Sequence, residues 1–329
     1  MKKFSLLIWL IGLAHCLNGQ SLILSDTQHD QLYFGWDVDL DQNRMLVGAY
    51  GAEESGYLLF GNIYFYTFQE GGWNLEEKME SPLPEPTKYG FSVALSGDYG
   101  ISSKGSNISG QSRSAFILHN TGADWFTPQQ LQSGDAYFGI DVDMHGEYAI
   151  VGAMLGNKDN YRPGSAHIYK NNGEDWAKEA VVNPSDQISG QTYFGEAVAI
   201  NEHFAVVGAY GADDYTGAAY VYIFQDSSWV ELQKLTASDG GNYFSFGDDV
   251  AIYDSTIIIG ASRDGEGGSN AGAAYVFEWE DGLFIQKTKL LPNEVSPYDR
   301  FGRAVAVFQN KVLIGASRDD SNEENGGAA

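Results

Sequence analysis

The sequence predicts an all-β fold, a β-propeller of four-stranded blades with five complete units and a truncated sixth. Two spaced motifs and one compositional pattern predict it. A Phe-Gly or Tyr-Gly pair recurs at intervals of 49 to 56 residues, and a Gly-Ala pair follows it at a fixed distance. Between these motifs, short runs of β-branched and aromatic residues are bounded by Gly, Asn and Asp, which is typical of strands and tight turns.

The first motif marks the start of each repeat. Its glycines are Gly35, Gly90, Gly139, Gly195, Gly247 and Gly302. Thirteen residues later comes the Gly-Ala pair, except in the second repeat, where Ser103 takes this place; its glycines are Gly48, Gly152, Gly208, Gly260 and Gly315. Such self-similarity is the signature of a repeat architecture. We expect repeat units that start near residues 33, 88, 137, 193, 245 and 300.

The fourth repeat illustrates the four strands of a unit. Its apolar runs cover residues 197–200, 204–207, 218–224 and 230–235. No segment of the sequence keeps a helical period, so we expect almost no helix. Four strands per unit, repeated radially, build a propeller blade, and a blade buries both faces only against its neighbours.

Small and aromatic residues recur at fixed places in the units. We interpret the glycines of both motifs as positions where backbones crowd together near a narrow axis. An aromatic residue recurs at the start of the fourth strand: Trp73, Trp125, Trp176, Trp229 and Phe284. Stacking on a sugar is one hypothesis for these aromatics, but packing between neighbouring blades is the favoured interpretation.

Three motif elements together carry a resemblance to a known family. Five Phe-Gly pairs are each followed by Gly-Ala: Phe34-Gly35, Phe138-Gly139, Phe194-Gly195, Phe246-Gly247 and Phe301-Gly302. A small-residue pair precedes the aromatic strand at Gly164-Ser165, Gly217-Ala218 and Gly272-Ala273. The chain thus resembles FG-GAP repeat proteins of the bacterial type, and its pattern is similar to the β-propeller head of integrin α subunits. The family's proline after Gly-Ala is replaced here, by Tyr50, Met154, Tyr210, Ser262 and Ser317.

Calcium is the cofactor that the resemblance makes possible. Integrin-type repeats often carry a D-x-D-x-D-G-like calcium loop between the first two strands of a blade. The corresponding turns here are short: Ser96-Gly97-Asp98, His145-Gly146-Glu147, Asn201-Glu202-His203 and Tyr253-Asp254-Ser255. Calcium takes six to eight oxygen ligands, and the alternating Asp37, Asp39 and Asp41 do not complete such a set. We therefore expect no cofactor, and no metal at the usual calcium loop.

The composition limits the classes of partner. The chain has 19 Lys and Arg against 44 Asp and Glu, which gives a net charge of −25, and 43% of its residues are hydrophobic. Phosphate binding needs clustered positive charge, so we expect no nucleic-acid partner. The hydrophobic content is too high for a disordered acidic tail.

The first 19 residues are interpreted as a signal peptide. Lys2 and Lys3 precede a mostly apolar run over residues 4–17, which is too short to cross a bilayer as a helix. Lipidation at Cys16, the only cysteine, is the alternative, because residues 13–16 loosely resemble a lipobox. We therefore expect a secreted or cell-surface protein with no transmembrane segment in this chain.

Ligand-binding residues are expected in the loops that follow the Gly-Ala pairs. In a propeller, these loops and the Phe-Gly entries open on one face, and binding residues concentrate on longer and more variable loops. Their candidate residues are Glu53, Glu54, Asp159, Asp213, Asp214, Arg263, Asp264, Arg318 and Asp319. Two interpretations stay open: a solvated acidic rim, or a rim that binds a protein, a glycan or a cation.

The favoured function is a recognition or adhesion scaffold that binds protein or carbohydrate through one face. The alternative is a polysaccharide-degrading enzyme, a glycosidase or a lyase, that uses rim carboxylates. The sequence identifies no catalytic residue, because the scattered histidines lack the spacing of metal ligands. It also has no G-x-S-x-G elbow and no Walker-type phosphate loop, and it does not identify the ligand.

The repeat domain is expected to span residues 20–329, with its last unit incomplete. Residues 327–329 match residues 217–219, where the third strand of the fourth unit starts, and residues 21–24 resemble a fourth strand. We interpret the chain as a fragment of a longer protein that could carry further blades and a C-terminal anchor. The alternative is an open propeller with exposed strand edges, which invite aggregation.

Overall fold

The computed structural model describes residues 33–51, 60–83, 87–105, 114–155, 163–186, 191–293, 296–319 and 327–329. The chain divides into two compact units. The first comprises Met1–Gln111 and Phe116–Gln130, and the second comprises Ser112–Ala115 and Leu131–Ala329. The expected signal peptide, Cys16 and the expected strand at residues 21–24 lie outside the described residues.

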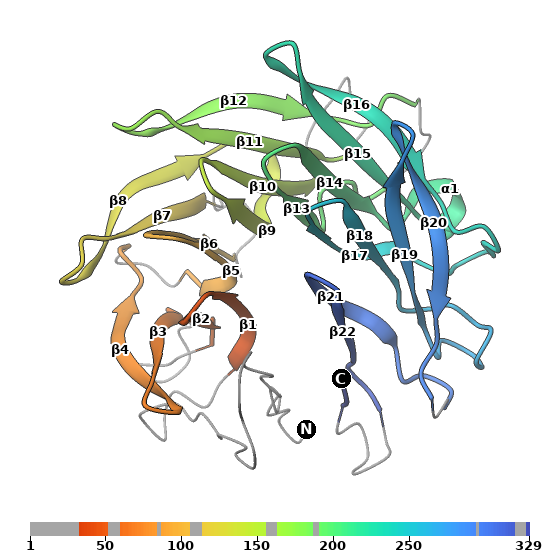
Figure 1. Cartoon of the computed structure of the whole chain (residues 1–329), viewed down its shortest axis with the longest axis horizontal. Coiled ribbons are helices and arrows are strands. Elements are labelled where there is room, and N and C mark those ends of the chain that lie inside the picture. The colour runs from red at the N-terminus through yellow and green to blue at the C-terminus, as the bar shows by residue number, and fades with distance from the viewer. Residues whose placement is uncertain are drawn as a thin grey trace. The chain divides into compact units, whose positions relative to one another are not determined.

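The first unit contains one four-stranded antiparallel sheet and most of a second, and both sheets follow the order of the chain (Figure 1). The strands of the first sheet are β1 (Phe34–Asp41), β2 (Arg44–Ala49), β3 (Asn62–Gln69) and β4 (Gly72–Glu80). Those of the second are β5 (Tyr89–Ser96), β6 (Tyr99–Lys104), β7 (Ser114–Asn120) and β8 (Trp125–Gln132).

The second unit contains three further four-stranded sheets, again in chain order. The first consists of β9 (Ala136–His145), β10 (Tyr148–Leu155), β11 (Ser165–Asn171) and β12 (Trp176–Val182). The next consists of β13 (Val198–Ile200), β14 (Phe204–Ala209), β15 (Ala218–Gln225) and β16 (Ser228–Leu235). The third consists of β17 (Phe246–Tyr253), β18 (Thr256–Ala261), β19 (Ala273–Glu280) and β20 (Leu283–Leu290). The inner strands β9, β13 and β17 lie next to one another in this order (Figure 1).

A two-stranded sheet of β21 (Phe301–Phe308) and β22 (Lys311–Ala316) follows next to β17. Ala328 pairs with Ala316 in the register in which Ala273 pairs with Ala261. Ala328 thus occupies the place where the third strand starts in the preceding sheet.

The prediction of an all-β fold is confirmed. Apart from the single turn of helix α1 (Ala212–Tyr215), the regular elements of the described residues are strands. Antiparallel four-stranded sheets that follow one another along the chain are consistent with a β-propeller.

The motif glycines are explained by the close approach of consecutive sheets. A Cβ atom on Gly208 would overlap the carbonyl oxygen of Gly247, and one on Gly260 would overlap that of Gly302. The same relation holds in the first unit between Gly48 and Gly90. The prediction that these glycines allow backbones to crowd is confirmed, because any larger residue would push two strands apart.

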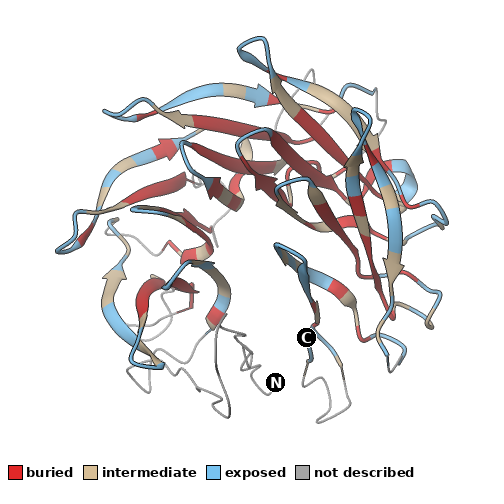
Figure 2. Cartoon of the chain, viewed as in Figure 1, coloured by how far each residue is buried: buried red, intermediate tan, exposed pale blue. Residues whose placement is uncertain are grey.

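The aromatic residue at the start of each outer strand packs between sheets. Trp125 of β8 stacks on Phe65 of β3 with a ring-centroid distance of 4.0 Å. Phe284 of β20 lies 5.0 Å from the ring of Phe204 on β14. Trp73 is half-buried, and the other recurring aromatics of these strands are buried: Trp125, Trp176, Trp229 and Phe284. Figure 2 shows buried residues in every four-stranded sheet. The favoured interpretation, packing rather than sugar stacking, is therefore confirmed for Trp125, Trp229 and Phe284, each of which contacts an aromatic ring of the preceding sheet.

Candidate functional site

One position of each repeat has a fixed and unusual backbone conformation. The residue just before the aromatic-Gly pair has a positive φ of 50° to 69° in the described repeats, although none is glycine. These residues are Tyr33, Lys88, Tyr137, Tyr193, Ser245 and Arg300. Positive φ is uncommon for residues other than glycine and costs energy. Because all six repeats share it, the fold imposes this conformation, whereas the side chain varies from aromatic to basic to small.

In the second unit, four tyrosines gather at the Phe-Gly ends of the inner strands. Tyr193 and Tyr210 stack with centroids 4.7 Å apart and nearly parallel rings. Tyr215 lies 6.2 Å from Tyr210 and 6.0 Å from Tyr243. We call Tyr193, Tyr210, Tyr215 and Tyr243 the tyrosine stack. Its outermost member, Tyr243, is 62% exposed, so the stack offers an aromatic surface to solvent.

Carboxylates lie beside the tyrosine stack. Burial and the charge of Asp248 raise the pKa of Glu196 to about 7, and Tyr210 hydrogen-bonds to Glu196. Asp248 accepts a hydrogen bond from the Ser262 hydroxyl. Burial and the nearby carboxylates also raise the pKa of Tyr210 above its usual value, so its hydroxyl keeps its proton at neutral pH.

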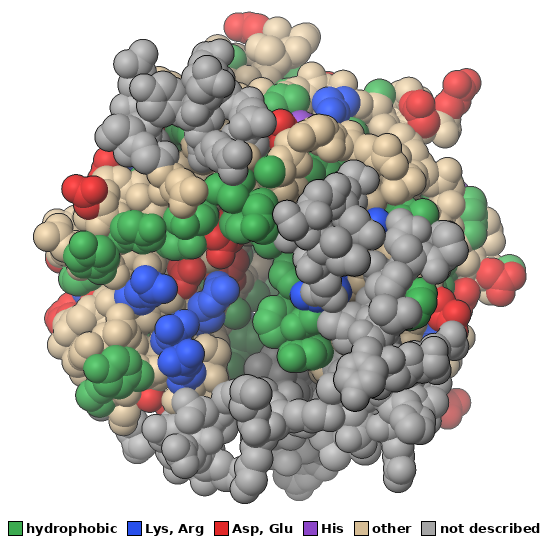
Figure 3. Space-filling view, turned by 180° about the vertical axis from the view of Figure 1, so that it is seen from behind, with side chains coloured by type: hydrophobic (Ala, Val, Ile, Leu, Met, Phe, Trp, Pro, Cys, Tyr) green, Lys and Arg blue, Asp and Glu red, His purple; other side chains and the backbone are tan. Residues whose placement is uncertain are grey.

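Four arginines lie near these carboxylates. We call Arg263, Arg300, Arg303 and Arg318 the arginine cluster. Arg303 Nη1 lies 3.7 Å from Asp248 Oδ1, and Asp248 raises the pKa of Arg303. Burial and the positive charges of Arg318, Arg263 and Arg303 lower the pKa of Arg300. Figure 3 shows Lys and Arg side chains gathered on one face, with acidic side chains beside them.

Backbone hydrogen bonds place Arg263 and Arg318 at equivalent positions of two successive repeats. Both follow a Gly-Ala-Ser sequence. The Arg263 amide donates to the Phe244 carbonyl at 3.2 Å, and the Arg318 amide donates to the Asp299 carbonyl at 3.0 Å. Each acceptor lies two residues before a Phe-Gly pair, so each loop is tied to the entry of its own repeat.

The first unit has its own group of aromatic residues at the corresponding end. Tyr33 and Tyr50 stack at 4.5 Å, and the Lys88 ammonium lies 5.2 Å from the centre of the Tyr50 ring. Trp36 contacts Tyr50 edge-on at 4.9 Å and is 50% exposed. Phe91 completes the group, in which aromatic rings lie beside the ammonium of Lys88.

The comparison with known proteins agrees with the repeat structure. A family model described as FG-GAP repeat matches residues 127–169, 176–222, 229–277 and 284–329, more than half of the chain. The chain belongs to the FG-GAP repeat family. No curated protein matches it. Each FG-GAP match begins in the outer strand of one sheet and continues into the next sheet, so the family unit straddles two consecutive sheets.

Two of the predicted ligand-binding residues, both in loops that follow Gly-Ala pairs, form ion pairs with lysines of outer strands. Asp213 Oδ2 lies 2.9 Å from the Nζ atom of Lys234. Asp264 is fully buried and accepts hydrogen bonds from Tyr275 Oη and Lys289 Nζ, both at 2.8 Å. Both aspartates therefore fasten their loops to the sheet, and a direct role in ligand binding stays a prediction.

The remaining predicted residues divide into three groups. Glu53, Glu54 and Asp159 lie outside the described residues. Asp214 is exposed, and the Asp319 carbonyl accepts a hydrogen bond from the Gly327 amide at 2.9 Å. Arg263 and Arg318 come together with Arg300 and Arg303, which the sequence interpretation missed because it considered the loops after Gly-Ala and not the residues flanking the Phe-Gly pair.

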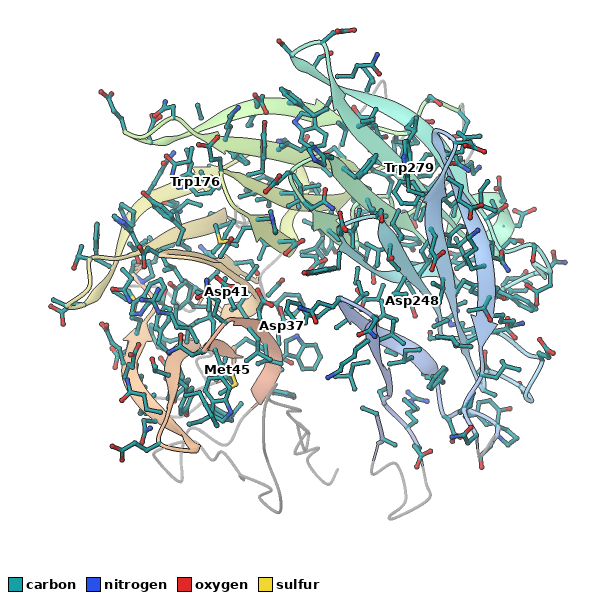
Figure 4. The ribbon with its side chains drawn as sticks, in the orientation of Figure 1. Asp37, Asp41, Met45, Trp176, Asp248 and Trp279 are labelled. Atoms are coloured by element: carbon teal, nitrogen blue, oxygen red, sulfur yellow. The ribbon has the colours of Figure 1, made fainter. Side chains whose placement is uncertain are left out.

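The alternating aspartates of the first FG-GAP repeat have a structural role. Asp37 and Asp39 accept hydrogen bonds from the amides of Val93 and Leu95, both at 2.7 Å, and Asp41 accepts one from Gly97 at 2.6 Å. Figure 4 labels Asp37 and Asp41 on β1. These carboxylates join β1 to the next sheet, which explains their alternation without a metal ion.

Within the described part of the chain, no group of three or more His, Cys, Asp or Glu side chains is placed to hold a metal ion. No helix among those residues is long and apolar enough to cross a membrane.

Proposed function

We propose that the chain is a non-catalytic recognition scaffold, secreted or exposed on the cell surface, which binds a protein or carbohydrate through the tyrosine stack and arginine cluster. One observation carries the proposal. The residue before each Phe-Gly pair keeps one backbone conformation, whereas its side chain is Tyr193, Ser245 or Arg300 in three successive sheets. A constant scaffold with variable side chains at one end suits binding.

A Ser-His-Asp group formed by Ser165, His167 and Asp135 lacks the geometry of a catalytic triad. Ser165 and His167 both contact the same oxygen, Oδ2 of Asp135, at 3.0 and 2.7 Å. In a triad, the histidine lies between the other two side chains and uses a different ring nitrogen for each. His167 is also only 2% exposed, so this group supports the sheet rather than a reaction.

A polysaccharide-degrading enzyme is the second candidate, and one observation favours it. Glu196, with its pKa raised to about 7, could act as a general acid beside the carboxylate of Asp248. The Ser262 hydroxyl and Arg303 already contact Asp248, which weakens it as a nucleophile or base. Incubation of the chain with polysaccharides, followed by analysis for shortened products, separates the two candidates.

The proposed function is tested by a binding screen of the chain against arrays of glycans and extracellular proteins. For a ligand found there, Tyr243→Ser removes the exposed ring of the stack, and we expect the affinity to fall about tenfold. Phe308→Ser is the matched control, because Phe308 is also exposed but lies beside the turn at the other end of β21. Equal affinities of both variants and the unchanged chain would contradict binding at this face.

A further inference from the structure

The arginine cluster stands out because the chain as a whole is strongly acidic, with 44 Asp and Glu against 19 Lys and Arg. Among the residues that the structure describes, Arg303 has an acidic partner, Asp248, whereas no carboxylate lies within ion-pair distance of Arg263, Arg300 or Arg318. Like charges that are brought together repel one another. Such an arrangement gains stability when an anion binds to it.

Arg300 adds a second and independent observation. Its Nε atom is buried and has no hydrogen-bond partner among the described residues. A buried donor without an acceptor is costly, and such exceptions call for a ligand or another explanation. A guanidinium presents its N–H groups in a planar fork that matches the two oxygens of a carboxylate or the oxygens of a sulfate.

The tyrosine stack and the arginine cluster lie next to each other. Tyr210 hydrogen-bonds to Glu196 and also lies close enough to Arg303 to interact with it electrostatically. The flat, partly exposed rings can pack on the apolar face of a sugar ring. Glu196 and Asp248 supply acceptors for sugar hydroxyl groups, and the arginines supply donors.

We propose that the tyrosine stack and the arginine cluster together bind an acidic polysaccharide, with a sugar carboxylate held by Arg300 and Arg303. The inference rests on the proposed recognition function and names its ligand class. An acidic peptide fits less well, because its carboxylates would face Glu196 and Asp248 without the hydroxyl donors that a sugar ring provides.

The experiment measures binding of the chain to polygalacturonate by calorimetry. Fully methyl-esterified polygalacturonate, dextran, dextran sulfate and poly-glutamate are the comparison probes. We expect polygalacturonate to bind, and dextran and the methyl ester to bind at least about tenfold more weakly, because charge-assisted hydrogen bonds are lost. The affinity falls as salt is raised, since charge attraction is screened.

Two variants locate the site. Arg303→Gln and Arg263→Gln change exposed side chains and should each weaken polygalacturonate binding about tenfold or more. Lys311→Gln removes one positive charge from an exposed residue beside the turn of β21 and β22 and should leave the affinity unchanged. Thermal unfolding of each variant confirms that it is folded.

Each other outcome overturns the inference in its own way. Tighter binding of poly-glutamate than of polygalacturonate identifies an acidic peptide as the partner, and tighter binding of dextran sulfate identifies a sulfated glycan. Equal loss of affinity in Lys311→Gln shows that only overall charge matters. If no anionic probe binds but a ligand from the array screen loses affinity in Tyr243→Ser, the inference fails and the proposed function stands.

Discussion

Strand β13 has two different neighbours in the second unit, and the difference shows two ways of joining sheets. Toward β9, its Val198 and Ile200 amides donate to the carboxylates of Asp141 and Asp143 at 2.8 and 2.7 Å. In the repeat of β13, Ala197 and Ala199 take the places that Asp141 and Asp143 hold in the preceding repeat. Toward β17, both alanines belong to one buried apolar cluster with Val206, Val250 and Ile259.

The same alternation continues along the chain. Asp249 of β17 accepts a hydrogen bond from the Val305 amide of β21 at 2.7 Å, and β1 supplies three such carboxylates to the sheet of β5 within the first unit. The odd-numbered repeats therefore supply carboxylates to the repeat that follows. We call these contacts carboxylate seams, and the contact between β13 and β17 the apolar seam. Similar backbones are thus joined by different chemistry.

The largest expected effect comes from placing a carboxylate in the apolar seam. Ala199→Asp should lower the free energy of unfolding by about 3 kcal/mol, because Ala199 is only 4% exposed and an aspartate there is desolvated among apolar side chains. Urea unfolding measures it. Ala306→Asp is the control, because Ala306 holds the same place in β21 and is exposed. Unchanged stability of Ala199→Asp would show that the two kinds of seam are interchangeable.

Removing a carboxylate from its seam should have a smaller effect. Asp143→Ala leaves the Ile200 amide without its acceptor in a buried strand, which should cost about 1 to 3 kcal/mol. Asp143→Asn keeps an oxygen acceptor and should cost less. Calorimetric melting temperatures in the order unchanged chain, Asn variant, Ala variant would confirm the hydrogen bond as the cause. The opposite order of the two variants would contradict it.

The smallest expected effect is a dependence on pH. Burial and the charge of Asp141 raise the pKa of Asp249 to about 8. The folded chain therefore holds this proton more tightly than the unfolded chain does, so the stability from this group is full below about pH 4 and is lost as the pH rises through 8.

Asp249→Asn tests this dependence because the amide does not titrate. Relative to the unchanged chain, the variant should gain about 1 kcal/mol of stability between pH 7.5 and pH 9. Asp254→Asn, an exposed residue of the turn between β17 and β18, is the control. A constant difference between Asp249→Asn and the unchanged chain over this range would disprove the assignment.

The strands were predictable because the same two motifs recur in the repeats and mark where strands begin and end. The Phe-Gly and Gly-Ala pairs mark where backbones approach, and the glycines at these places admit no side chain, as Gly208 and Gly247 show. The carboxylate seams can also be recognised in the sequence. In alternate repeats, an aspartate follows the glycine of the Phe-Gly pair by two residues: Asp37, Asp141 and Asp249. The aspartates of β1 were interpreted as an incomplete metal site because the strand that donates to them is 56 residues away.

The candidate site was less predictable because it depends on contacts between distant residues. Asp264 is an acidic loop residue in the sequence, yet Lys289 and Tyr275 bury it. Arg300 and Arg303 flank a Phe-Gly pair, and nothing local in the sequence shows that they meet Arg263 and Arg318.

Hydrogen–deuterium exchange of the whole chain, with and without the highest-affinity ligand of the array screen, tests recognition through this face most directly. We expect slower exchange at residues 210–215, 243–248 and 300–303, which carry three tyrosines of the stack, the carboxylate of Asp248 and two arginines of the cluster. The turns at residues 254–255 and 309–310, at the other end of the same strands, should exchange unchanged. Protection at these turns without protection at the tyrosine stack and arginine cluster would contradict the proposed function.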